Sequence, residues 1–287
     1  MRISTQTDPI YPNFGIDEGT KIFAEAGFDA LDFSMFWMVR KKPSIYDGMS
    51  EDEIVNRLLA ASAKYNIPFN QAHAPFPSYR FGEDEYNKMA LEKIKMAVRI
   101  AGKIGAQQII VHPIACPDGV DQKQFNIDFY NQLKPICEEY KTKVALENMF
   151  AYDPHRKVKK ANVCSFGEDL AEYFDALDPK YFTVCLDIGH CGLVGDDAAH
   201  AIRVLGHDRL TALHVHDNNY IEDMHMPPLT VDLDWEEIAK ALHDINYSGD
   251  LTLEDDGFVS DLPKRALVNA TRLTYDLAAE LRDMIGL

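Results

Sequence analysis

Short apolar runs alternate with longer amphipathic segments along the whole chain. Residues that favour β-structure gather in eight runs: 2–7, 28–35, 69–75, 107–113, 143–149, 182–189, 210–217 and 249–256. Apolar residues at helical spacing mark the segments near 16–26, 51–65, 84–104, 123–141, 166–177, 196–206, 234–245 and 262–284. This alternation predicts parallel strands joined by crossover helices. Eight such units in 287 residues favour a closed (β/α)8 barrel, the TIM barrel, over an open doubly wound sheet.

The composition is that of a globular chain with a large core. Apolar residues make up 46% and charged residues 26% of the sequence. No linker rich in proline, glycine or serine divides it, so we expect a single domain over residues 1–287. No run of about 18 apolar residues occurs, and the first ten residues lack the apolar stretch of a signal peptide. We therefore expect no membrane partner and a cytoplasmic location.

Charge and cysteine usage narrow the possible partners further. The net charge is −17, whereas a nucleic-acid-binding protein normally carries a basic surface, so nucleic acid is an unlikely partner. The one notable basic cluster, KVKK at 157–160, is typical of a solvated loop. Five cysteines without a CxxC pair argue against disulfides or a thiolate zinc site, and Cys185 lies in an apolar run typical of a core.

Residues that can ligate a metal end six consecutive strand candidates. In chain order these residues are His73, His112, Glu147, Asp187 with His190, His214 with His216, and Glu254. Side chains alternate along a strand, so Val111 points away from His112 and Leu146 away from Glu147. The apolar neighbours suit the helices, and the polar residues then face the barrel axis. Active sites of such barrels lie at the carboxyl ends of the strands, so these residues are predicted to converge.

A cluster of buried carboxylates and imidazoles is costly unless a cation compensates it. The donor set contains no thiolate and suits Mn²⁺ or Zn²⁺ first, with Co²⁺, Fe²⁺ and Mg²⁺ as alternatives. Taken singly, His73 or His112 would more often be a hydrogen-bonded core histidine, and each carboxylate could be a helix cap or an ion-pair partner. His214, one step deeper than His216, favours a supporting or core role. The constellation as a whole predicts a metal centre.

Four other histidines lie in predicted loops or helices and are expected at the surface: His155, His200, His207 and His243. The loop after the seventh strand differs, because Asp223 and His225 in it have a spacing that could reach back over the mouth of the barrel. Phe36, Trp37 and Phe76 could form an apolar wall there, or serve in ordinary packing. The sequence leaves the oligomeric state open, and a homo-oligomer is compatible with it.

Six sequence strings together resemble those of one superfamily: QAHAPF, IIVHP, ALENM, CLDIGH, LHVHDNN and LTLEDD. They are similar to the xylose-isomerase-like TIM barrels, which include sugar isomerases and epimerases and a family of apurinic/apyrimidinic endonucleases. The resemblance covers roughly residues 70–256. It implies a small-molecule carbohydrate substrate for the first group and abasic DNA for the second.

The epimerase branch of this resemblance implies one metal ion held by Glu147, Asp187, His216 and Glu254. The two glutamates would also be an acid/base pair, and His190 would contact the substrate. The endonuclease branch implies three zinc ions, and the chain has a candidate for each of the nine ligands: His73, His112, Glu147, Asp187, His190, His216, Asp223, His225 and Glu254.

Two features bear on the expected activity. The first argues against a ketose 3-epimerase, and the second is similar to other sugar isomerase relatives. In ketose 3-epimerases an arginine follows the strand-seven histidine by six residues, and the position counted from His216 is Glu222. The stretch MPPLTVDLDWEEIAKAL instead resembles uncharacterised sugar isomerase relatives. We therefore expect a metal-dependent sugar isomerase or epimerase that moves a proton next to a carbonyl through an enediolate, with Glu147 and Glu254 as the proton-transfer groups. A trinuclear-zinc phosphodiesterase is the alternative.

Overall fold

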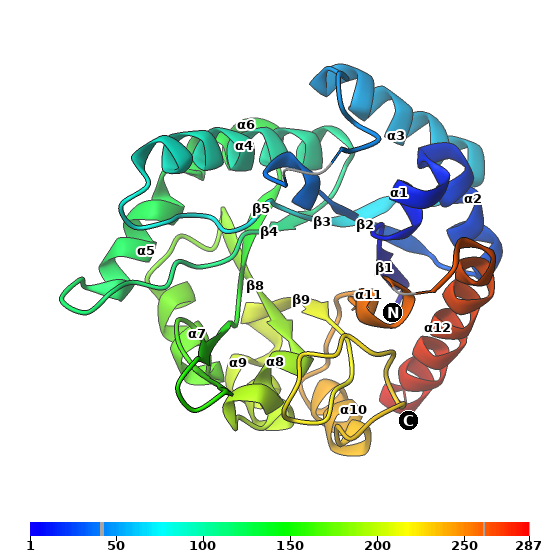
Figure 1. Ribbon diagram of the computed structural model, residues 1–287. Helices are drawn as coiled ribbons and strands as arrows, with labels where there is room; N and C mark the ends of the chain where they lie inside the picture. Colours follow the sequence, from blue (N-terminus) through cyan, green and yellow to red (C-terminus); the bar gives the residue numbers. More distant parts are fainter. Residues whose placement is uncertain (41–42, 261, 287) are drawn as a thin grey trace.

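The computed structural model describes residues 1–40, 43–260 and 262–286, and every predicted element lies within these ranges. Eight parallel strands surround a central axis (Figure 1): β1 (Ile3–Gln6), β2 (Ala30–Ser34), β3 (Phe69–His73), β4 (Gln108–Ile110), β5 (Lys143–Glu147), β8 (Phe182–Asp187), β9 (Leu210–His214) and β10 (Leu251–Leu253). Their order in the sheet is β10-β1-β2-β3-β4-β5-β8-β9. The predicted TIM barrel is therefore confirmed, with each strand shorter than its apolar run.

The barrel closes at a seam between β9 and β10. The two strands meet just beyond the end of β9, through a parallel bridge between Val215 and Leu253. The Val215 amide donates to the Thr252 carbonyl at 2.9 Å, and the Glu254 amide donates to the Val215 carbonyl at 3.1 Å. The seam thus lies beside His214, the last residue of β9, and Glu254, the residue that follows β10.

Helices form the outer ring seen in Figure 1: α2 (Ile16–Ala26), α3 (Glu51–Tyr65), α4 (Asp84–Lys103), α5 (Gln122–Asn131), α6 (Lys134–Tyr140), α7 (Gly167–Asp175), α9 (Ala198–Arg209), α10 (Trp235–Asp244) and α12 (Lys264–Ile285). The Ser50 hydroxyl accepts from the Glu53 amide at the start of α3, as the sequence predicts. The prediction of one helix over 123–141 is wrong. Pro135, which lacks a backbone N–H, lies in the first turn of α6, where a helix tolerates it. Within the described residues, no helix combines the length and apolar character needed to cross a membrane.

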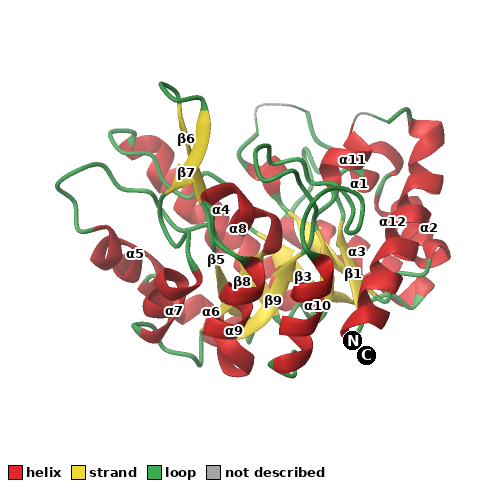
Figure 2. Ribbon diagram, turned by 90° about the horizontal axis from the view of Figure 1, so that it is seen from below, coloured by secondary structure: helices red, strands yellow, loops and turns green. Residues whose placement is uncertain are grey.

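Several short elements follow the carboxyl ends of strands and were not predicted. They are α1 (Ile10–Phe14), the 3-10 turn η1 (Phe36–Met38), α8 (Ile188–Val194), α11 (Asp256–Ser260) and a hairpin of β6 (Phe150–Asp153) and β7 (Val158–Ala161). Figure 2 shows the hairpin projecting from the barrel end that also carries α1 and α11. The expected solvated loop at 157–160 is therefore corrected to a turn followed by most of β7. Within it, the Lys159 side chain is only 15% exposed.

The barrel core has the two-sided pattern predicted from strand alternation. Ile110, Ala145, Cys185 and Ala212 form a small buried cluster inside the barrel. Their chain neighbours, such as Val111 and Leu146, instead belong to the large cluster packed against the helices. Each fully buried aliphatic side chain of that layer contributes on the order of 1.5–3 kcal/mol. The inward-facing positions continue at the strand ends into the polar residues described next.

Candidate metal centre

Four side chains from four strand ends meet at the barrel axis. Glu147, Asp187 and His214 are the last residues of β5, β8 and β9, and Glu254 directly follows β10. One ligand atom from each lies within 4.8 Å of the others. All four are buried, and Glu254 is the most exposed at 8%. The fold therefore brings these residues together although up to 107 positions of sequence separate them.

His214 lies between the two glutamates. Its Nδ1 is 2.6 Å from Oε1 of Glu147 and 2.7 Å from Oε2 of Glu254. Burial opposes a charge on this imidazole, but Cys185, Glu254 and Glu147 around it outweigh burial and raise the pKa of His214 well above its ordinary value. Burial likewise opposes ionisation of Glu147, yet His214 and His112 hold the pKa of that carboxyl well below its usual range.

The charge balance of this four-residue group suits a divalent cation. Burial opposes the charge on Asp187, but His190 and His216 outweigh it and lower the pKa of that carboxyl. Burial opposes the charge on Glu254 too, and His214 outweighs it, so the pKa of Glu254 is also lowered. Three buried carboxylates thus share one central imidazole. Buried negative charge of this density is compensated in proteins by cations, and oxygen and imidazole donors bind divalent metals.

The sequence reasoning placed His216 with the two glutamates and Asp187, whereas the structure places His214 in that group. His216 Nε2 lies 3.0 Å from Oδ1 of Asp187, and its ring stacks on His225 with centroids 4.1 Å apart. His216 thus belongs to a second group, with His190, Asp223 and His225. Counted six residues from His214, the expected arginine position is Tyr220 rather than Glu222, and neither is an arginine.

Two further groups flank the four central residues. In the second group, Oδ1 of Asp223 is buried without a hydrogen-bond partner and lies 3.9 Å from Nε2 of both His190 and His216. A third group consists of His73, His112 and Glu147. Nε2 of His112 is 3.0 Å from Nε2 of His73 and 2.9 Å from Oε2 of Glu147. Burial outweighs the attraction of Glu147 and lowers the pKa of His112, which favours a neutral imidazole.

Backbone carbonyls fix the orientation of three histidines. Nδ1 of His73, His190 and His225 lies 2.8 Å from the carbonyl oxygens of Ala74, Asn148 and Glu254, respectively. A carbonyl only accepts, so each Nδ1 carries the proton and donates it. In the neutral imidazole the Nε2 lone pair then faces its group, which is the usual second-sphere arrangement of metal-binding histidines. This hydrogen bonding and the unpartnered Asp223 oxygen both fit a bound cation.

Aromatic side chains border the histidines. Phe36 stands edge-on to His73 at 4.7 Å, and Phe76 stacks on His112 at 4.7 Å. Trp37 instead stacks on Tyr46, so it serves packing. Sequence reasoning missed Phe150, which stands edge-on to His190 at 4.9 Å and comes from the unpredicted hairpin. The other four histidines, predicted to lie at the surface, are all exposed: His155, His200, His207 and His243.

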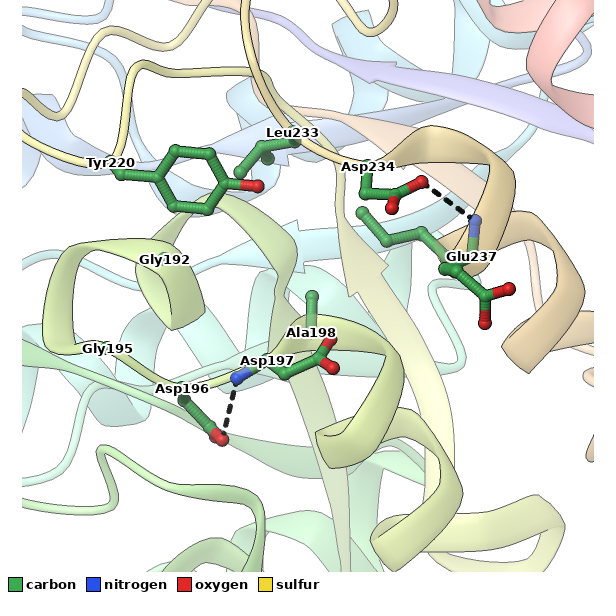
Figure 3. A pocket seen from close by; sticks show the side chains of 10 residues that line it. Gly192, Gly195, Asp196, Asp197, Ala198, Tyr220, Leu233, Asp234 and Glu237 are labelled. Carbon is green, nitrogen blue, oxygen red and sulfur yellow. Dashed lines mark hydrogen bonds between the residues drawn. The ribbon is translucent and has the colours of Figure 1, made fainter.

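An acidic cavity of about 410 Å³ lies to one side of this centre, between α8, α9 and α10 (Figure 3). Its three aspartates accept from backbone amides, and the fourth carboxylate, Glu237, pairs with Arg203. Asp234 accepts from the Glu237 amide at the start of α10, and Asp196 accepts from the Asp197 amide before α9. Tyr220 and Leu233 line its upper wall. None of these carboxylates belongs to the three groups.

Comparison with known proteins defines the class. The chain belongs to the xylose isomerase-like TIM barrel family, which it matches over residues 21–272. It is 26% identical to an uncharacterised protein of Sinorhizobium fredii over 299 aligned positions, which cover 94% of this chain and 91% of the relative. The resemblance seen in the sequence strings is thus confirmed at the level of the family.

Solved structures share the fold over nearly the whole chain. A D-tagatose 3-epimerase-like protein superposes with a TM-score of 0.77 at 19% identity, covering 100% of this chain and 98% of the other. The IOLI protein, solved with a bound zinc atom, gives a TM-score of 0.76 at 16% identity, covering 98% and 99%. Further structures of the same fold are sugar 3- and 4-epimerases. At these identities the similarity establishes the fold.

Proposed function

We propose that this protein is a metal-dependent isomerase or epimerase of a sugar or sugar derivative. The observation that carries the proposal is the pair of buried glutamates, Glu147 and Glu254, which face one another across His214 Nδ1 at 2.6 and 2.7 Å. Structural neighbours that are sugar epimerases support the same reaction class. A carbohydrate is the substrate class that this proposal implies.

In this proposal Glu147, Asp187, His214 and Glu254 hold one divalent ion, with Mn²⁺ or Zn²⁺ preferred and Co²⁺, Fe²⁺ or Mg²⁺ compatible with the donors. His214 replaces His216 in the proposed ligand set because it is the histidine within reach of all three carboxylates. When bound, the ion supplies Lewis acidity that stabilises negative charge on the carbonyl oxygen of the substrate. The zinc-containing structure of the same fold supports a metal at such a site.

The two glutamates would move the proton. One carboxylate takes the proton from the carbon next to the carbonyl and becomes a carboxylic acid. The other takes up a proton from solvent and delivers it to the substrate, after which the first releases its proton to solvent. Return on the opposite face inverts the carbon, and return on the same face to the neighbouring carbon isomerises the sugar. Gln6 Nε2 donates to Oε1 of Glu254 at 2.8 Å and fixes its orientation. His190, beside Phe150 at the rim, would contact a substrate hydroxyl.

The second and third groups support a second candidate function. His73 and His112 with Glu147, and His190, Asp223 and His225 beside His216, each offer a further ion site. Three such sites are what a trinuclear-zinc endonuclease requires. The net charge of −17 opposes binding to a DNA backbone. We therefore expect no incision and only weak binding of an abasic duplex in a gel shift at physiological salt. Sub-micromolar affinity with incision would place the nuclease first.

Metal analysis and hydrogen exchange test the main proposal. Protein purified without chelator should contain at least one divalent ion per chain. Incubation with a panel of ketoses and aldoses in D₂O should introduce deuterium next to the carbonyl of one substrate, as detected by NMR. The variant His155→Gln, changed at an exposed position far from the centre, should behave like the natural chain. An ion content near zero, with no thermal stabilisation by added Mn²⁺ or Zn²⁺, would contradict the proposal.

A further inference from the structure

Asp217 is a fully buried carboxylate that the proposed reaction does not use. It follows β9 by three residues and opens the segment 218–234 that leads to α10. Its two oxygens accept five hydrogen bonds, from the amides of Asn218, Thr230, Val231 and Leu233 and from the indole of Trp235, at 2.8–3.1 Å. The Asp217 side chain thus binds the amide at the start of the segment and several amides near its end.

The backbone of Asp217 closes a loop as well. Its amide donates to the Met226 carbonyl at 2.7 Å, and the Met226 amide donates to the Asp217 carbonyl at 3.1 Å. This pair brings the start of the segment against its middle. His225, the residue before Met226, is thereby held with its ring 4.1 Å from that of His216, the residue before Asp217. Asp223 lies two residues earlier, with Oδ2 3.2 Å from His225 Nε2.

Five N–H donors compensate the negative charge of the Asp217 carboxylate. Across residues 1–40, 43–260 and 262–286, no lysine, arginine or histidine forms an ion pair with it. A buried carboxylate without a cation is tolerated where N–H groups surround it, and removal of the charge leaves those groups unsatisfied. Asp234 and Trp235, which lie in the stretch MPPLTVDLDWEEIAKAL, both take part in this arrangement. Asp234 caps α10, and Trp235 turns its indole back to Asp217.

We propose that Asp217 is a positioning residue that holds Asp223 and His225 against His190 and His216. It acts through those two residues, because it touches the loop that carries them and not the four central ligands. The metal-binding part of this inference rests on the proposed metal dependence and goes beyond it, since it requires a further ion at the second group beside the one held by the four central residues. The geometric part, the hold on segment 218–234, stands without an ion.

The first test is Asp217→Asn, which keeps the shape but turns one acceptor oxygen into a donor. Hydrogen exchange followed by mass spectrometry should show faster exchange in 228–234, by about 10- to 100-fold, the loss expected when buried hydrogen bonds to a charged group are broken. The control is Asp121→Asn, which makes the same change at the exposed cap of α5, where asparagine can still accept from the Gln124 amide, and it should leave this segment unchanged. Trp235→Phe removes one of the five donors and covers the case in which Asp217→Asn does not fold.

The second test is a double-mutant cycle read by Zn²⁺ titration. Asp217→Asn should weaken binding of Zn²⁺ by roughly 10-fold or more in the natural chain and should change nothing further in the Asp223→Asn/His225→Gln background. An equal loss in both backgrounds would show that Asp217 supports the barrel generally and would overturn the proposal, as would unchanged exchange in 228–234. A natural chain that binds no Zn²⁺ overturns the proposed function instead, and hydrogen exchange alone then decides the positioning role.

Discussion

Replacement of Glu147 by glutamine is the perturbation that separates the two roles proposed for this residue. The side chain is 1% exposed, with Oε1 2.6 Å from His214 Nδ1 and Oε2 2.9 Å from His112 Nε2. Glutamine has nearly the same shape and keeps one oxygen that can ligate an ion or accept from His214. It loses the negative charge and the ability to take a proton. The fold should survive, because this residue lies at the mouth of the barrel and not in its helix-facing core.

The expected loss of activity exceeds the expected loss of metal. General base catalysis contributes about 10²–10⁴-fold, which corresponds to about 2.7–5.4 kcal/mol of activation free energy. Ion binding should only weaken, since three ligands remain unchanged and the amide oxygen can replace the fourth. Glu254→Gln is the matched partner, because Glu254 lies on the other side of the same His214 nitrogen at 2.7 Å. Both variants should therefore lose turnover by similar orders of magnitude.

Three measurements on the same samples decide the question. Deuterium incorporation in D₂O reports proton transfer, elemental analysis reports ion content, and thermal unfolding with and without chelator reports the fold. The reasoning is refuted if both variants, loaded with metal, keep near-normal deuterium incorporation on a verified substrate. It is equally refuted if each variant unfolds to the same extent with and without metal, because the glutamates would then be structural.

Three further expectations concern the same region. Chelation should lower the melting temperature, and readdition of Mn²⁺ or Zn²⁺ at 100 times its Kd should restore about 2.7 kcal/mol of stability, whereas an unchanged melting temperature would argue against a bound ion. Gly189→Ala should lower the free energy of unfolding by about 1–3 kcal/mol and reduce ion content, because the added Cβ would lie 2.0 Å from Cε1 of His216. The control Gly286→Ala, whose added Cβ would lie 3.6 Å from its nearest atom, should change thermal unfolding little. Burial raises the pKa of Asp8 to about 6, above its ordinary 3.8, so the contribution of this carboxyl to stability should fall by up to about 3 kcal/mol as pH rises from 4 to 6. Asp8→Asn should remove this contribution from the pH dependence of the urea-unfolding free energy, and an identical slope in both proteins would contradict it.

The sequence predicts the barrel well because its signals are local and repeated. Alternation of Ile110 and Val111, or of Ala145 and Leu146, follows from the period of a strand and needs no knowledge of distant contacts. The hairpin of β6 and β7 escaped prediction because its residues are mostly polar or exposed, and Val158 is 46% exposed. Its strands pair with each other and bury little apolar surface, so no apolar run marks them.

The residue types of the site could be predicted more readily than the choice of the histidine that lies level with the two glutamates. His214 and His216 share one face of the chain, so strand alternation alone assigns both to the axis. Which of them lies level with Glu147 depends on the register between β8 and β9, and that register shifts between Val184 and Cys185. A register irregularity leaves no local signal in the sequence. Gly189 offered the one clue, since its missing side chain makes room for the His216 ring.

The seam between β9 and β10 links the candidate metal centre to the stability of the barrel wall. A ladder of backbone hydrogen bonds joins each of the remaining pairs of neighbouring strands, while β9 and β10 meet at the Val215–Leu253 bridge. His214 and Glu254 stand on either side of that junction, with Nδ1 and Oε2 2.7 Å apart. An ion bound by both residues would cross-link β9 and β10, the neighbouring strands with the fewest backbone hydrogen bonds between them. Ion binding would then stabilise the closed barrel, and local unfolding of the metal-free protein would begin at the seam between β9 and β10.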